Sequence, residues 1–172
     1  MENYMLVAGL IEAHPNREVV GRTRLQRTVC LLQRVGMGTN YTFSLQSAGP
    51  YSEELQSDIT TIERVGLGTE ELRVVEGDIP RSVLRVKAEA RNSQVDGFCS
   101  LIEKMAEADL NVLELAATYD AFRETGSDHA DALRRLLAKK GSKCDSKRVE
   151  EAISLLRFIG LPAPEYVRHA TL

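Results

Sequence analysis

Apolar side chains recur along most of this chain at the spacing of α-helices. In one stretch they stand at positions i, i+4, i+7 and i+10, on a single helical face, as Leu25, Val29, Leu32 and Val35. The same periodicity, with glycine or proline near several ends, predicts helices over residues 2–13, 22–36, 53–65, 95–107, 110–124, 129–140 and 147–159. The residues expected to face inward from the third helix are Leu55, Ile59, Ile62 and Val65.

Two other segments show the pattern of β-strands. Residues 41–46 alternate apolar and polar side chains, which predicts a short strand. Residues 71–89 contain two β-branched runs separated by residues 77–82, which predicts a hairpin with a longer turn.

The resulting order of helix, helix, strand, helix and hairpin is close to that of a winged-helix unit. We therefore expect an α+β, mostly helical fold. Residues 1–92 would form a winged-helix-like part with a short strand and a β-hairpin, and residues 93–172 a helical layer packed on it. We expect the two parts to form one domain, since the chain has only 172 residues.

A Gly-Pro-Tyr-Ser sequence connects the predicted short strand to the third helix. Glycine adopts backbone conformations that are unfavourable for other residues, and proline restricts the entry to a helix. Ser52 suits the N-cap position of that helix. We predict that Gly49, Pro50 and Ser52 form a structural corner, and that Tyr51 either anchors this corner or contacts a partner.

Four arginines on the predicted second helix are the main candidates for binding: Arg22, Arg24, Arg27 and Arg34. Arginine can make paired hydrogen bonds to phosphate or carboxylate groups. Two other interpretations stay open. The arginines could cover a solvated helix face, or one of them could reach the Gly-Pro-Tyr corner, with Gln26 or Tyr51 hydrogen-bonded nearby.

Composition and charge narrow the function classes. The net charge of −3 argues against general binding of polyanions. Residues 70–91, which include the predicted hairpin, carry five bases and five acids, which counts against simple insertion into a DNA groove. The cysteines are Cys30, Cys99 and Cys144, far apart and without a CxxC motif, so we expect a reducing cytoplasm. No apolar run approaches about 18 residues, so no membrane span is expected.

Local motifs for catalysis or cofactor binding are absent from the sequence. The three histidines do not combine with other ligands at metal-binding spacing, and no P-loop or GxGxxG motif occurs. We therefore predict no catalytic residue, no metal and no cofactor.

The sequence Gly21-Arg-Thr-Arg-Leu-Gln-Arg-Thr-Val-Cys-Leu-Leu, with Tyr41-x-Phe and Gly49-Pro-Tyr-Ser-Glu-Glu-Leu, resembles the YwgA-like family of uncharacterised prokaryotic proteins. The helical end, Leu113-Glu-Leu-Ala-Ala-Thr and Val149-Glu-Glu-Ala-Ile-Ser-Leu-Leu-Arg-Phe-Ile-Gly-Leu, is similar as well. A more distant similarity is to the Panacea domain of SocA-type antitoxins, which also has an arginine- or lysine-Leu-Gln-Lys helix and a strand ending in Gly-Pro. Here Tyr51-Ser52 follow, which suits the first family better.

These resemblances imply a role in a small genetic module, such as a toxin–antitoxin or defence system. The first hypothesis is a non-enzymatic regulator or adaptor that binds a protein partner, for example a toxin or a defence effector. The alternative is a nucleic-acid-binding transcriptional regulator that uses the arginine-rich second helix. A third is an enzyme without a local motif, and a homo-oligomer is left open.

Overall fold

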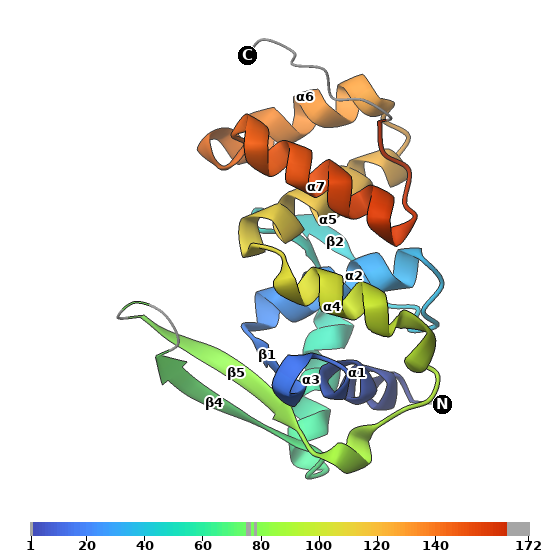
Figure 1. Ribbon diagram of the computed structural model, residues 1–172, viewed down its shortest axis with the longest axis vertical. Helices are drawn as coiled ribbons and strands as arrows, with labels where there is room; N and C mark the ends of the chain where they lie inside the picture. Colours follow the sequence, from blue (N-terminus) through green and yellow to red (C-terminus); the bar gives the residue numbers. More distant parts are fainter. Residues whose placement is uncertain (1, 75–76, 78, 165–172) are drawn as a thin grey trace.

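The computed structural model describes residues 2–74, 77 and 79–164 and shows an α+β fold that is mostly helical (Figure 1). Its helices, among the described residues, are α1 Asn3–Glu12, α2 Arg22–Arg34, α3 Glu53–Arg64, α4 Cys99–Glu107, α5 Leu110–Glu124, α6 His129–Lys140 and α7 Ser146–Ile159. Its strands are β1 Glu18–Val20, β2 Ser44–Gln46, β3 Gly49–Tyr51, β4 Gly68–Val74 and β5 Pro80–Val86. All seven predicted helices are present within a few residues of their expected bounds.

Local side-chain caps explain where several helices begin. Ser52 accepts a hydrogen bond from the backbone N–H of Leu55, which confirms it as the N-cap of α3. Aspartates cap α5, α6 and α7 in the same way, namely Asp109, Asp128 and Asp145. Val65, by contrast, lies just past the end of α3 and is 49% exposed, so the expectation that it faces inward is wrong.

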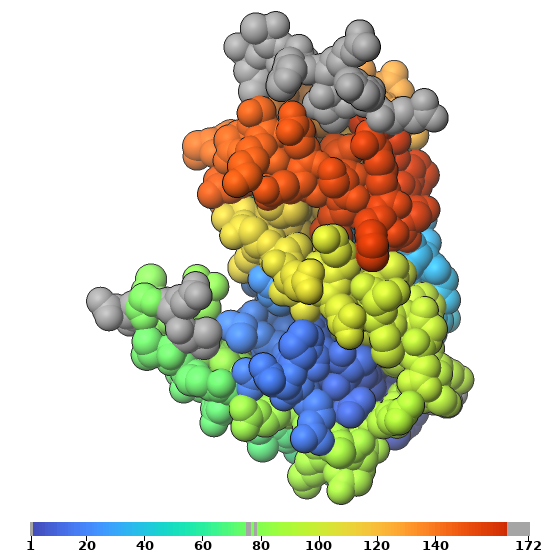
Figure 2. Space-filling model, viewed as in Figure 1, coloured from blue at the N-terminus to red at the C-terminus, as the bar shows by residue number. Residues whose placement is uncertain are grey.

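A three-stranded antiparallel sheet has the order β1-β5-β4. The predicted hairpin is present as β4 and β5, although residues 75, 76 and 78 of its turn lie outside the described residues. β1 was not predicted, because three residues carry little periodicity and its strand conformation depends on pairing with β5. In Figures 1 and 2, the β4–β5 hairpin extends away from the helices.

The Gly-Pro corner has a different form from the one expected. The predicted strand 41–46 is shortened to β2, and the chain turns at Ser47 and Ala48. Gly49 and Pro50 then lie inside the returning strand β3, which pairs with β2. Proline has no backbone N–H to donate. It is tolerated here because β2 and β3 form a two-stranded ribbon, in which no third strand needs a hydrogen bond from this position.

One buried cluster of apolar side chains runs through both parts of the chain, from Leu6 in α1 to Leu161 after α7. α2 is central, because it packs against α5, β3, β1 and α4. The core therefore continues across residue 92 without a break. In the described part of the chain, no helix has both the length and the hydrophobicity needed to cross a bilayer.

Candidate partner-binding surfaces

The two outer arginines of α2 form ion pairs with neighbouring elements. Arg22 pairs with Glu70 of β4, and its Nε donates to that carboxylate at 2.7 Å. Arg34 pairs with Asp120 at 2.8 Å and with Glu124 at 2.9 Å, both on α5. These contacts tie α2 to the hairpin at one end and to the helical layer at the other.

Arg24 binds the C-terminal end of α4. Its Nη1 donates to the carbonyl oxygens of Met105 and Ala108, each at 2.9 Å. The last carbonyls of a helix lack partners within the helix and carry the negative end of its dipole. Burial lowers the pKa of Arg24, but these acceptors suit a cation and couple α2 to α4.

Arg27 is only 2% exposed and holds the corner from inside. Its two terminal nitrogens donate to the backbone carbonyls of Ala48 and Pro50. Next to it, Gln26 exchanges two hydrogen bonds of 2.9 Å with the backbone N–H and C=O of Ser52. These contacts are the ones that the bracing interpretation of the arginines required, and they leave Arg27 inaccessible to a macromolecule.

Gly49 lies where the corner meets α2. Its φ of +108° is in the region that favours glycine, as expected from the sequence. A Cβ here would lie 3.0 Å from Nε of Arg27 and 3.1 Å from Oγ1 of Thr118. Tyr51 is half-buried, and its hydroxyl has no hydrogen-bond partner among the described residues, so its role stays a prediction.

A buried ion pair below the corner was missed by sequence reasoning. Nζ of Lys140 donates to Glu114 at 2.6 Å and to the carbonyl of Ser47 at 2.7 Å. The side chains of Lys140 and Glu114 are 2% and 6% exposed. The sequence did indicate an unusual position, because Glu114 is an acidic residue within the apolar run of α5. Its partner Lys140 could not be identified, because it lies 26 residues away.

The β4–β5 hairpin carries three of the most exposed apolar side chains of the described residues. Leu72 is 77% exposed, Ile79 is 74% exposed and Val74 is 60% exposed. Leu72 and Val74 point to the same face of the strand, because they are two residues apart. This clustering of apolar side chains on a protruding element is typical of an interaction surface.

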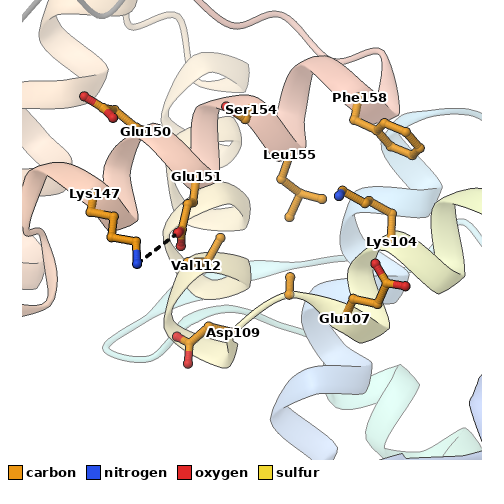
Figure 3. Close-up of a pocket in the computed structure, with 11 residues that line it drawn as sticks. Lys104, Glu107, Asp109, Val112, Lys147, Glu150, Glu151, Ser154, Leu155 and Phe158 are labelled. Carbon is orange, nitrogen blue, oxygen red and sulfur yellow. Dashed lines mark ion pairs between the residues drawn. The ribbon is translucent and has the colours of Figure 1, made fainter.

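A second exposed surface is the α4–α7 groove, which has a volume of about 770 Å³ and lies between α4, the start of α5 and α7 (Figure 3). Its apolar lining consists of Ala108, Val112, Leu155 and Phe158. Its charged lining consists of Lys104, Lys147, Glu107, Asp109, Glu150 and Glu151, four acids and two bases. Phe158 is 53% exposed, and Nζ of Lys104 lies 5.6 Å from the centre of its ring.

Cys30 and Cys144 offer no activated thiol in this structure. Cys30 is buried, and burial raises the pKa of its thiol to about 12. Cys144 is also buried, and its pKa is raised for the same reason. Because the thiolate is the nucleophilic form, neither residue is suited to nucleophilic chemistry at neutral pH.

We expect His14 to make folding sensitive to mild acid. Burial lowers the pKa of His14 to about 4. Its Nε2 has no hydrogen-bond partner among the described residues, so nothing there would accept a hydrogen bond from the protonated ring. Between pH 6.5 and 4 the unfolded chain binds the proton more readily, so stability is complete above this window and decreases as pH falls through it. Lowering the pH from 7 to 5 should reduce the free energy of unfolding by about 2 kcal/mol.

Urea denaturation at a series of pH values measures this effect. The His14→Gln variant is the control, because it keeps a polar side chain but cannot titrate. The difference in stability between the two proteins should change with pH. If the two proteins lose stability in parallel from pH 7 to 5, His14 is not the responsible group.

Comparison with known proteins does not assign this chain to a family. No family model and no curated protein matches it.

The geometry itself separates the candidate residues into two groups. Arg22, Arg24, Arg27 and Arg34 all have partners within the molecule. The β4–β5 hairpin and the α4–α7 groove instead present exposed apolar side chains to solvent.

Proposed function

We propose that this protein is a non-enzymatic regulator or adaptor that binds a protein partner in a prokaryotic toxin–antitoxin or defence module. The biological setting rests on the resemblance of the arginine helix and the Gly-Pro-Tyr-Ser corner to the YwgA-like family. The α4–α7 groove, with its exposed Phe158, is the observation that carries the binding role.

A winged-helix-like N-terminal half is part of this proposal. Support comes from the order α1, β1, α2, α3, β4, β5 and from the sheet order β1-β5-β4, in which the first short strand joins the hairpin. The β2–β3 ribbon would then be an insertion between α2 and α3.

Electrostatics favours a protein partner over nucleic acid. In a unit of this kind, α3 would be the helix that enters a DNA groove. α3 carries four acids, Glu53, Glu54, Asp58 and Glu63, and one base, Arg64, a net charge of −3. Phosphates would repel such a helix, and the arginines of α2 are already engaged within the molecule.

The α4–α7 groove suits an apolar segment with basic flanks. Its apolar lining can accept aliphatic or aromatic side chains, while four carboxylates against two lysines favour positive charge. Phe158 comes from the last turn of α7 and stands at one end of the groove, beside Lys104 (Figure 3). A half-exposed aromatic side chain in this position is typical of an anchor residue in an interface.

Replacing Phe158 with alanine should therefore weaken partner binding by about 2 kcal/mol, roughly 30-fold, with little change in stability. The measurement is titration calorimetry against purified products of the neighbouring genes. Leu45→Ala is the matched control, because Leu45 is also an exposed apolar residue, at 38%, and lies on β2 outside the groove.

A gel shift at two ionic strengths tests the alternative. The proposal expects weak DNA binding with a shallow dependence on salt. Tight binding that falls steeply with salt would instead support a nucleic-acid-binding regulator. Equal effects of Phe158→Ala and Leu45→Ala on partner affinity would contradict the role of the groove.

A further inference from the structure

The outer edge of β4 is open for pairing with another strand. β4 is the last strand of the sheet order β1-β5-β4, and β5 occupies only one of its sides. Gly21 donates its N–H to the carbonyl of Ser82 at 2.7 Å, so the backbone groups of Ser82 point toward the β1 side. Leu72, which is opposite Ser82, must then direct its own N–H and C=O to the open edge.

The same alternation applies at every second residue of β4. Glu70 and Val74 also direct their backbone groups to the open edge, while Glu71 and Arg73 bond to β5. An unpaired edge of this kind is a template for another strand unless charge or shape prevents it. Leu72 and Val74 are largely exposed here, so nothing in the described residues covers this edge near the end of the hairpin.

The side chains of β4 are complementary to a reversed copy of themselves. Consider two β4 strands paired antiparallel with Leu72 of each copy opposite the other. Glu71 of each copy then faces Arg73 of the second copy, and Leu72 faces Leu72. Leu72 meets Leu72 on one face. On the other face two opposite-charge pairs extend the network in which Arg73 already contacts Glu18 and Glu71 of its own copy, at 3.0 and 3.1 Å.

Neighbouring registers bring like charges together. A strand pair centred on Glu71 places two glutamates opposite each other, and one centred on Arg73 places two arginines opposite each other. Like charges directly opposite destabilise a sheet. The charges of β4 therefore select the register centred on Leu72.

We propose that this protein forms a two-fold symmetric homodimer through antiparallel pairing of β4, with Leu72 of one copy opposite Leu72 of the other. The contact is closed, because the same edge is used by both copies. The opposite edge of the sheet is β1, which has only three residues and does not offer an equivalent strand. The dimer would join two three-stranded sheets into one and carry two α4–α7 grooves. It is independent of the proposed partner, since it uses a different surface.

Reversing the charge at position 71 or 73 tests whether the two strands pair in this register. Glu71→Arg gives each copy two cations on this face of β4, and Arg73→Glu gives it two anions. Each variant alone should dimerise at least about tenfold more weakly than the parent, because both cross-strand pairs become repulsive. An equimolar mixture of the two variants should recover the affinity of the parent, because every pair is again opposite in sign. Sedimentation velocity over a range of concentrations gives these dissociation constants, with a monomer mass of 19.1 kDa as reference.

A cysteine cross-link tests the position of the two-fold axis. Cα atoms of a hydrogen-bonded antiparallel pair lie about 5.5 Å apart, which suits a disulfide. Leu72→Cys should therefore form a disulfide-linked dimer under mild oxidation, whereas Leu45→Cys, exposed on β2, should not. Cys30 and Cys144 are buried, and Cys99, which is partly exposed, is replaced by serine in both variants.

The results decide the proposal in either direction. A concentration-dependent dimer, rescue in the mixture and a cross-link at Leu72→Cys support it. A parent protein that stays monomeric at the highest concentration, or a dimer that neither charge reversal weakens, overturns it. A thermal melt of each variant verifies that the fold is retained.

Discussion

Replacing Glu114 with alanine should lower the free energy of unfolding by about 3–5 kcal/mol, since removing one partner of a buried ion pair leaves an uncompensated charge. The Lys140 side chain is 2% exposed, and the carbonyl of Ser47 would be its one remaining close acceptor among the described residues. Burial already lowers the pKa of Lys140, and Glu114 opposes this effect. Urea denaturation at neutral pH measures the loss.

Two further variants separate the ion pair from simple packing. The double variant Glu114→Ala with Lys140→Met should recover much of the stability, because no buried charge is left unpaired. Lys143→Ala should have an effect of less than about 1 kcal/mol, since half-exposed ion pairs contribute little; the Lys143 side chain is 48% exposed. A double variant as unstable as Glu114→Ala alone would show that the loss comes from packing around the carboxylate.

Replacing Arg27 with alanine should lower the free energy of unfolding by about 3 kcal/mol, because it leaves one buried and one partly buried carbonyl without a donor, and a cavity next to the corner. Those carbonyls belong to Ala48 and Pro50, on either side of Gly49. The corner should loosen as a result, and the hydrogen bonds between Gln26 and Ser52 should be weakened with it. Thermal and chemical denaturation measure the effect, and amide exchange at Leu55, whose N–H is bonded to Ser52, reports on the corner.

Arg22→Ala is the control, since it removes the same residue type from the same helix. Its partner Glu70 lies on the hairpin, and the Arg22 side chain is 32% exposed, so its loss should change stability by less than about 1 kcal/mol. Arg27→Lys should be intermediate, because lysine keeps the charge but lacks the planar fork that reaches two carbonyls. If Arg27→Ala and Arg22→Ala are equally stable, Arg27 does not brace the corner.

The contacts of α2 also change what a binding experiment on its arginines would mean. Weaker partner or DNA binding after substitution of Arg24 and Arg27 would first indicate a loosened fold. Arg24 holds the end of α4, and Arg27 holds the corner. Substitutions at Phe158 or Leu72 avoid this ambiguity, because both side chains are more than half exposed.

Helices and their ends could be predicted from the sequence because their causes are local. The predicted stripe of Leu25, Val29, Leu32 and Val35 marks the buried face of α2. The first three side chains are inaccessible to solvent, whereas Val35 lies just past the end of the helix and is half-buried. Ser52 acts on an N–H three residues away, so the start of α3 was visible as well. The β4–β5 hairpin followed from two β-branched runs separated by a turn.

Only the tertiary structure decided which contacts each arginine of α2 makes. Four arginines on one helix look equivalent in the sequence, but their partners lie 21 to 90 residues away and on different elements. One-dimensional patterns carry no information on such distances. The strand β1 and the pair Lys140–Glu114 were missed for the same reason, because each depends on a distant segment.

The sequence by itself determined that this is an α+β, mostly helical chain, since hydrophobic periodicity and helix caps act over a few residues. It also contained the charges of β4 and the exposed apolar residues around them. The tertiary structure decided which of these side chains reach solvent. Packing of α2 at the centre of the molecule buries Arg27, whereas the extension of the hairpin beyond the helices leaves Leu72 and Val74 uncovered.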